Sequence, residues 1–125
     1  MKTYSFEKLT CWQHARELAV WIYKLTKSFP AEEKFGIISQ MRRAAVSICS
    51  NIAEGSSRIS NKDQSHFYTM AFSSTMELLS QLIISTELMF ILDEDLQFVR
   101  IKIEQITRNL SALQRSILNP KRTKL

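Results

Sequence analysis

The sequence predicts an all-α fold, an antiparallel up-down-up-down four-helix bundle, from three observations. The 125 residues include only two glycines and two prolines beside 45% hydrophobic residues, which suits long helices better than a turn-rich β sandwich. Apolar residues recur at intervals of three and four along four segments. Short connections separate these segments, and such connections favour antiparallel neighbours. The length suits one domain with a substantial core.

The first helix is expected from about Phe6 to Lys27. Its apolar residues form two stripes, and so wide an apolar face indicates contact with more than one neighbouring helix. The stripes are Leu9, Trp12, Ala19 and Ile22, and Leu18, Leu25 and Phe29.

The second helix is expected to begin at Pro30, because proline suits the first helical position. Glu32 and Glu33 would complement the positive end of its dipole. Its core positions continue until Gly55, where glycine offers a stop. These positions are Ile37, Met41, Ala44, Ile48 and Ile52.

The third helix is expected to open at Ser60, which has capping-box spacing to Asp63, and to reach about Phe90. Its core positions are Phe67, Met70, Ala71, Ser74, Leu78 and Leu82.

The fourth helix has the most regular pattern. Asp93 is its expected cap, and the helix is expected to end at Asn119 and Pro120. Glu94 and Asp95 would face its dipole. Its apolar residues form a heptad seam of Leu96, Val99, Ile103, Ile106, Leu110, Leu113 and Ile117. We therefore expect a bundle over residues 1–119 and a basic C-terminal tail over residues 120–125.

A polar flank runs beside the apolar stripe of the second helix. An ordinary solvated face is one interpretation, but small residues on the second and third helices permit the close approach of a helix–helix or subunit contact. At about 100° per residue, Arg43 lies on this flank and Glu77 on a similar polar flank of the third helix, so the two are expected partners. Burying such charges is costly unless they are paired, and a paired network can fix register or oligomer state. We predict that these residues organise a homo-oligomer: Gln40, Arg42, Arg43, Ser47, Asn51, Glu54 and Glu77.

The net charge of +5, from 17 Lys and Arg against 12 Asp and Glu, indicates affinity for a polyanion such as RNA, DNA or an acidic partner. Such contacts give salt-dependent binding with little sequence specificity. The alternative is a solvated outer face with a disordered tail. The predicted nucleic-acid-binding residues are Arg100, Lys102, Arg108, Arg115, Lys121, Arg122 and Lys124.

Few residue patterns in the sequence support a catalytic site or a metal site. A di-iron bundle needs two Glu-x-x-His pairs, whereas the chain offers Asp63-x-x-His66 and a separate His14. Cys49 has no base placed beside it, and no glycine-rich phosphate loop is present. We therefore expect no enzyme, no metal and no cofactor.

We expect a cytoplasmic protein without a membrane segment. Cys11 and Cys49 lie in apolar helical contexts without metal-ligand spacing, as small buried thiols in a reducing compartment would. No stretch approaches the roughly 20 apolar residues of a spanning helix.

Five motifs extend along the chain. They are W-x-x-A-x-x-L-A at Trp12 to Ala19, F-P-x-x-E at Phe29 to Glu33, Q-M-R-R-A-A-x-S-I at Gln40 to Ile48, N-I-A-E-G at Asn51 to Gly55, and S-x-x-E-L at Ser74 to Leu78. With these motifs the chain resembles the bacterial four-helix-bundle proteins encoded by intervening sequences within 23S ribosomal RNA genes.

The resemblance covers nearly the whole chain and weakens in the fourth helix. It implies an antiparallel protomer that assembles into a ring, typically a homopentamer. It also implies a relation to the accessory variability determinant of diversity-generating retroelements, a basic ring that works with a reverse transcriptase and its RNA. The function of most family members is unknown.

The sequence thus favours a non-enzymatic homo-oligomer that presents a basic surface to structured RNA or to a nucleic-acid-processing protein. The alternative is a protein-interaction scaffold with no nucleic-acid ligand, whose charge matches an acidic protein.

Overall fold

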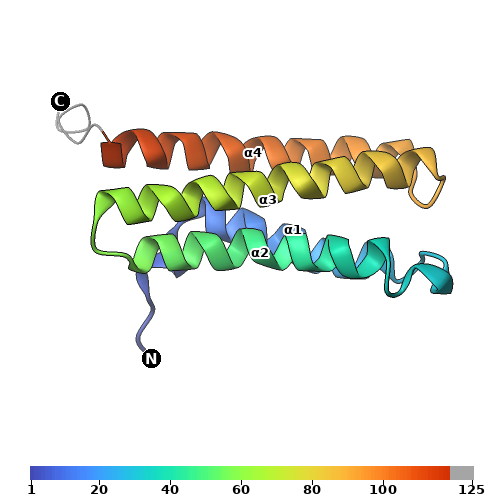
Figure 1. The fold of residues 1–125 in the computed structure, drawn as a ribbon, viewed down its shortest axis with the longest axis horizontal. Coiled ribbons are helices and arrows are strands. Elements are labelled where there is room, and N and C mark those ends of the chain that lie inside the picture. The colour runs from blue at the N-terminus through green and yellow to red at the C-terminus, as the bar shows by residue number, and fades with distance from the viewer. Residues whose placement is uncertain (119–125) are drawn as a thin grey trace.

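The computed structural model describes residues 1–118, which form four α-helices and two short 3₁₀ helices and contain no strand (Figure 1). The α-helices are α1 (Thr10–Thr26), α2 (Ile37–Ser57), α3 (Asn61–Glu87) and α4 (Asp93–Leu118). The 3₁₀ helices are Ser5–Lys8 and Ala31–Glu33. The predicted tail over residues 120–125 lies outside the described residues.

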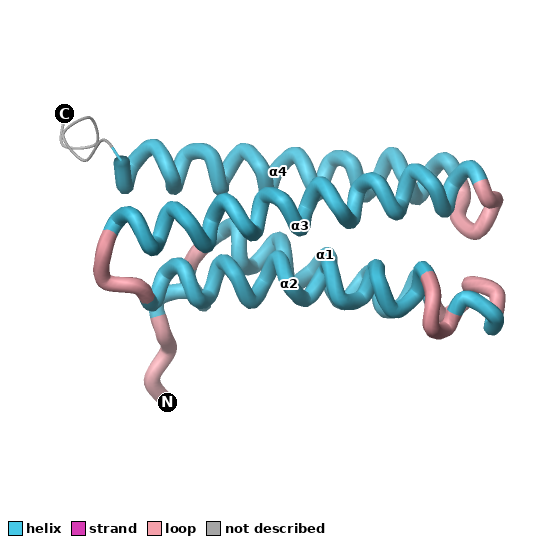
Figure 2. The backbone as a smooth tube through the Cα atoms, viewed as in Figure 1, coloured by secondary structure: helices cyan, strands magenta, loops and turns pink. Residues whose placement is uncertain are grey.

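The four helices lie along one another as a bundle. The connections from α1 to α2 and from α3 to α4 lie at one end of the molecule, and the connection from α2 to α3 lies at the other (Figures 1 and 2). α1 packs against α2 and α4, and α3 packs against the same two helices. Every helix thus has two neighbours, as its apolar stripe requires.

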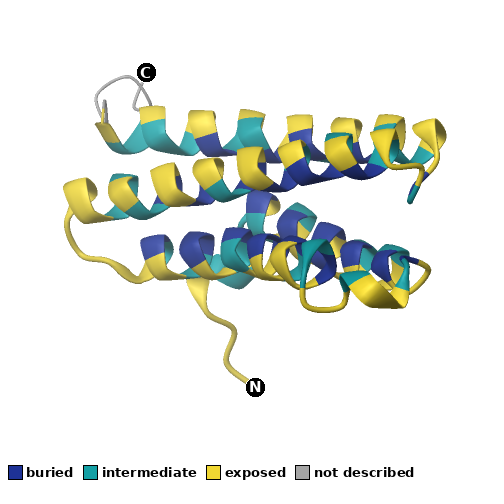
Figure 3. Cartoon of the chain, turned by 45° about the vertical axis from the view of Figure 1, so that its right-hand side comes forward, coloured by how far each residue is buried: buried dark blue, intermediate teal, exposed yellow. Residues whose placement is uncertain are grey.

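The core runs along the centre of the bundle. Figure 3 shows buried residues on the inner faces of the helices and exposed residues on the outer faces. The predicted seam of α4 is confirmed, because Val99, Ile103, Ile106 and Leu110 are buried. Its remaining members, at the two ends of the helix, are partly buried against the core: Leu96, Leu113 and Ile117.

α2 begins at Ile37, so the prediction of a start at Pro30 was wrong. The segment before it closes tight turns instead, since Glu33 N–H donates to Pro30 O at 2.9 Å and Gly36 N–H donates to Glu33 O at 3.0 Å. Gly36 has φ −106° and ψ −118°, which are not helical angles. The continuous helix can therefore form only after Gly36.

Gly55 does not stop α2, which continues to Ser57. It is buried in the last turns of the helix, against α3. A Cβ atom at this position would lie 2.6 Å from Cε1 of Tyr68. Glycine is needed here because α2 and α3 approach closely, and not because the backbone turns.

The start of α3 agrees with the sequence prediction, whereas the start of α4 and the end of α3 differ from it. Ser60 caps α3 as predicted, accepting a hydrogen bond from Asp63 N–H at 3.1 Å. α4 already includes Asp93, so Leu92 takes the cap position, and its N–H donates to Asp95 Oδ2 at 3.3 Å. α3 ends at Glu87 and does not reach Phe90, because Met89 adopts a left-handed φ of 64°.

The first predicted helix is also interrupted. Leu9 is extended, with φ −74° and ψ 126°, and it separates the 3₁₀ helix Ser5–Lys8 from α1. Within the described part of the chain, no helix combines the length and apolarity needed to cross a membrane.

Candidate subunit and nucleic-acid surfaces

The inner part of the predicted polar flank connects α2 to α3. Ser47 Oγ and Ser74 Oγ are 3.0 Å apart, and Asn51 Nδ2 donates to Ser47 O at 2.9 Å and to Ser47 Oγ at 3.1 Å. Asn51 is buried. Since buried polar groups cost free energy unless they are hydrogen-bonded, these bonds explain how Asn51 and Ser47 are accommodated between two apolar stripes.

The outer part of the flank contains the predicted ion pair. Arg43 Nη2 lies 3.4 Å from Glu77 Oε2, and the two side chains are 71% and 43% exposed. Gln81 Nε2 also approaches Glu77 Oε2, at 3.5 Å. Gln81 Oε1 is buried and has no hydrogen-bond partner among the described residues. An exposed ion pair stabilises a protomer by only about 0–1 kcal/mol, so Arg43 and Glu77 are free to contribute to another contact.

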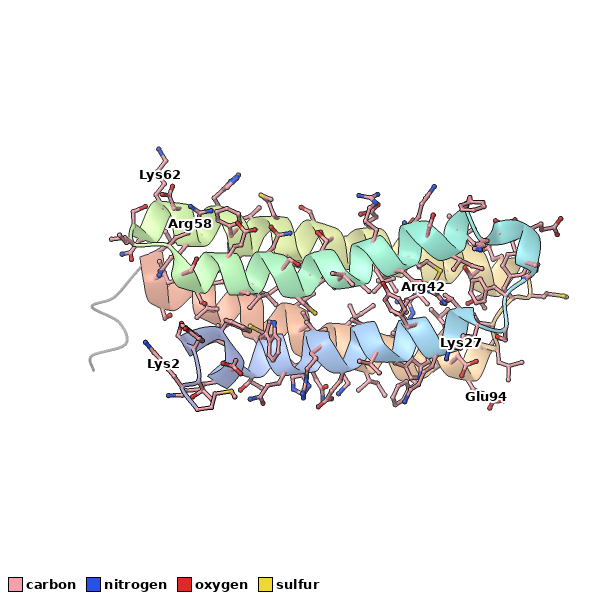
Figure 4. The ribbon with its side chains drawn as sticks, turned by 90° about the horizontal axis from the view of Figure 1, so that it is seen from below. Lys2, Lys27, Arg42, Arg58, Lys62 and Glu94 are labelled. Carbon is pink, nitrogen blue, oxygen red and sulfur yellow. The ribbon has the colours of Figure 1, made fainter. Side chains whose placement is uncertain are left out.

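Arg42 lies on the other side of α2, against α1 (Figure 4). Its Nε donates to Thr26 Oγ1 at 2.9 Å, and its Nη2 donates to Tyr23 O at 3.3 Å. Among the other predicted interface residues, Glu54 forms an ion pair with Arg58 at 3.2 Å, and Gln40 is exposed. The structure therefore brings Arg43, Ser47, Asn51 and Glu77 to the α2–α3 contact and directs Arg42 to α1.

The predicted basic surface of α4 divides between two neighbours. Arg108 and Arg115 line a hollow of about 350 Å³ at the α3–α4 contact. The two arginines share this hollow with the hydroxyl groups of Thr107 and Ser111 and with Phe72 of α3. Glu104 also lines it and forms an ion pair with Arg108 at 3.3 Å, but the Arg108 side chain remains 76% exposed.

Lys102 is not part of this hollow. It lies at the α1–α4 contact, where its Nζ is 2.8 Å from Glu17 Oε2 and 3.3 Å from His14 Nδ1. The hydrogen bond from Lys102 lowers the pKa of Glu17. Arg100 is exposed on α4, and Lys121, Arg122 and Lys124 lie outside the described residues.

Phe72 was missed by the sequence interpretation. It lies one residue beyond Ala71, off the apolar stripe of its helix, and is 40% exposed. An aromatic residue off the buried stripe could have signalled a surface role, because core packing does not account for it.

The two thiols are poorly suited to nucleophilic chemistry. Burial raises the pKa of Cys11 to about 11 and that of Cys49 to about 11, from an ordinary value of 9.0. Both groups are therefore neutral near pH 7, whereas the nucleophile is the thiolate. Within residues 1–118, no three histidine, cysteine, aspartate or glutamate side chains gather as metal ligands.

The raised pKa of Cys11 predicts a loss of stability in alkali. The unfolded thiol releases its proton near pH 9 and the folded thiol near pH 11, so its contribution is complete below pH 9 and disappears as the pH rises through 11. Urea unfolding measures the free energy of unfolding at pH 8 and at pH 11. Between these two pH values, Cys11→Ala should lose about 2 kcal/mol less of this free energy than the parent protein. Equal losses in the two proteins would contradict the inference that Cys11 is a buried, neutral thiol in the folded state.

Comparisons with known proteins agree on the fold. A solved structure from Bacteroides thetaiotaomicron, described as a protein of unknown function from the S23 ribosomal protein family, superposes with a TM-score of 0.76. It is 21% identical, and the match covers 85% of this chain and 99% of that chain. No curated protein matches the sequence. The model of the 23S rRNA-intervening sequence protein family matches residues 7–112. The chain therefore belongs to the 23S rRNA-intervening sequence protein family.

Proposed function

We propose that the chain is a non-enzymatic, cytoplasmic protein whose antiparallel protomers assemble into a ring, as a homopentamer, and present a basic surface to RNA or to a nucleoprotein partner. The observation that best supports RNA binding is the α3–α4 hollow with its two arginines. A relation to retroelement accessory proteins, and work with a reverse transcriptase, stay predictions from the resemblance.

The chemistry of this hollow suits a phosphate backbone. Guanidinium groups bind phosphate through paired hydrogen bonds, and the hydroxyl group of Ser111 is a further donor, whereas Thr107 Oγ1 already donates to Glu104 O at 3.2 Å. Arg108 and Arg115 are separated by about 10 Å along the helix axis, at 1.5 Å per residue. Along the axis of a duplex, each strand carries one charge about every 3.4 Å, so both arginines can contact the same strand. A ring would repeat the hollow in every protomer.

Replacing both Arg108 and Arg115 with Gln is expected to lower RNA affinity at least tenfold at physiological salt. Two lost phosphate contacts on a single strand should also reduce the slope of log affinity against log salt by about 1.4. Fluorescence anisotropy of a labelled structured RNA, measured over a salt series, gives both quantities.

Lys27→Gln combined with Lys62→Gln is the matched control, because it removes two exposed charges from other parts of the bundle (Figure 4). The control should keep the parent slope. No RNA binding by the parent protein at low salt would contradict the proposal and favour the protein-interaction scaffold.

The proposed subunit contact uses the outer side of the α2–α3 contact. Apolar side chains are exposed on both helices, since Val46 of α2 and Met70 and Ile84 of α3 are each 37–47% exposed. For Met70 the prediction of a core position was therefore wrong. The exposed Arg43–Glu77 pair lies on the same two helices. We assign Arg43, Glu77 and the exposed Gln40 and Glu54 to the contact between subunits, and Arg42 to packing within the protomer.

Arg43→Ala is expected to weaken the assembly, because it leaves Glu77 unpaired in the contact between subunits. Sedimentation velocity should show a larger fraction of slowly sedimenting protein than for the parent. Arg108→Ala is the control, because it also breaks an exposed ion pair, on α4. Identical sedimentation of Arg43→Ala and the parent would contradict the assigned contact.

A further inference from the structure

A second hollow, of about 410 Å³, lies where α1 ends and α2 begins. Three basic residues line it, Lys34, Arg42 and Arg43, and none of its lining residues is acidic. Two aromatic residues, Tyr23 and Phe35, are also part of its wall. The hollow is separate from the one on α4, and it lies in the size range of small-ligand sites.

Arg42 is held in place before any ligand arrives. Its Nε–H and one N–H of Nη2 are bound to Thr26 Oγ1 and Tyr23 O, at 2.9 and 3.3 Å. Thr26 is buried and is itself oriented by its bond to Ile22 O at 2.8 Å. The guanidinium carbon also lies 4.7 Å from the centroid of the Tyr23 ring. Because a guanidinium has five N–H donors, Arg42 retains donors for an anion in a fixed orientation.

The electrostatic surroundings favour an anion. α2 starts at Ile37 beside this hollow, its first turn contains no acidic residue, and Gly36 provides no side-chain cap. The positive end of the helix dipole thus adds to the charges of Lys34 and Arg42, whereas the charge of Arg43 is paired with that of Glu77. The carboxylate of Glu33 makes only a long contact with Ile37 N, at 3.5 Å, so it compensates this end of the helix weakly.

Phe35 gives the hollow an exposed aromatic wall. It is 88% exposed, although it lies next to half-buried Gly36 and one turn from buried Ile38. Lys34 Nζ lies 5.5 Å from the centroid of its ring. An aromatic ring that is exposed beside basic side chains matches a ligand with both a flat ring and a negative charge. Nucleobases stack on such rings whatever their sequence.

We propose that this hollow binds a nucleoside phosphate, with the phosphate on Arg42 and Lys34 and the base stacked on Phe35. The ligand is either a free nucleotide or one nucleotide of a single strand. The site is independent of the α4 hollow and requires neither RNA binding there nor assembly into a ring.

Isothermal titration of the full-length protein with AMP, adenosine and inorganic phosphate tests the proposal. AMP should bind more tightly than either of its parts, because it uses both the cations and the ring. A single-stranded tetranucleotide should be titrated alongside, to separate the two sources of the ligand. Tetranucleotide binding that is tighter than AMP binding and is weakened by Phe35→Ala identifies a strand in this hollow, and equal binding identifies a free nucleotide.

Phe35→Ala is the decisive variant, since so exposed a side chain can be removed without disturbing the core. It should weaken AMP or tetranucleotide binding roughly five- to hundredfold, the range for one lost base–aromatic stack, and leave inorganic phosphate binding unchanged. Phe72→Ala, at the α4 hollow, is the matched control and should leave AMP binding unchanged. Lys34→Gln should weaken AMP and phosphate together.

Two results would overturn the proposal. One is the absence of binding by both AMP and the tetranucleotide, and the other is unchanged binding of both in Phe35→Ala. Neither result affects the α4 surface, which is tested by the Arg108 and Arg115 variant. If RNA does not bind at the α4 hollow, the AMP titration still tests the hollow between α1 and α2.

Discussion

Gly55→Val is expected to destabilise the bundle by about 2–3 kcal/mol, the cost of overpacking a closely packed helix contact. The first added atom would lie 2.6 and 2.9 Å from two ring carbons of Tyr68, and 3.2 Å from Cβ of Phe67. Tyr68 is only 2% exposed, so its ring cannot move aside into solvent. The higher helix propensity of valine offsets only a few tenths of a kcal/mol.

Urea unfolding followed by circular dichroism measures this loss. Ser50→Val is the control, because Ser50 is on the same helix and exposed. It introduces the same side chain without a clash, so its unfolding free energy should stay within about 0.5 kcal/mol of the parent value. If Gly55→Val unfolds at the same urea concentration as Ser50→Val, the close approach of α2 and α3 at Gly55 is incorrect.

Ile106→Ala is expected to lower the free energy of unfolding by about 2–5 kcal/mol. Ile106 is completely buried in the middle of the α4 seam. Removing its outer carbons loses the free energy of burying them and leaves a cavity, because the surrounding close-packed helices relax only in part.

Ile101→Ala provides a control with the same chemical change on the same helix. Ile101 is 62% exposed, and alanine raises helix propensity equally at both positions. The difference between the two variants in urea unfolding therefore isolates the effect of burial. A difference below about 1 kcal/mol would mean that Ile106 is not in the core.

The repeat of apolar residues was enough to predict four helices and the buried side of α4. Val99, Ile103, Ile106 and Leu110 are buried as the heptad pattern predicted, because a regular helix places residues three and four apart on one face. The same angular reasoning predicted the Arg43–Glu77 pair, which is observed at 3.4 Å.

The predictions from the sequence were wrong mainly at residues whose type has more than one structural role. Pro30 and the acidic residues after it suit a helix start, yet they form a separate 3₁₀ turn because Gly36 leaves the helical conformation. Gly55 suits a helix stop, yet it allows two helices to touch. Arg42 was grouped with the polar flank, although its bonding partners are on α1.

The helical class, the buried seam of α4 and the excess of basic residues all follow from the order of residues along the chain. Which distant residues share a surface depends instead on how the helices pack: Phe72 lies with Arg108 and Arg115, and Tyr23 and Phe35 lie with Arg42. The physical reason is that periodicity reports the direction of a side chain around its own helix. The rotation, spacing and axial alignment of neighbouring helices depend on how all their side chains pack together, and no single segment contains that information.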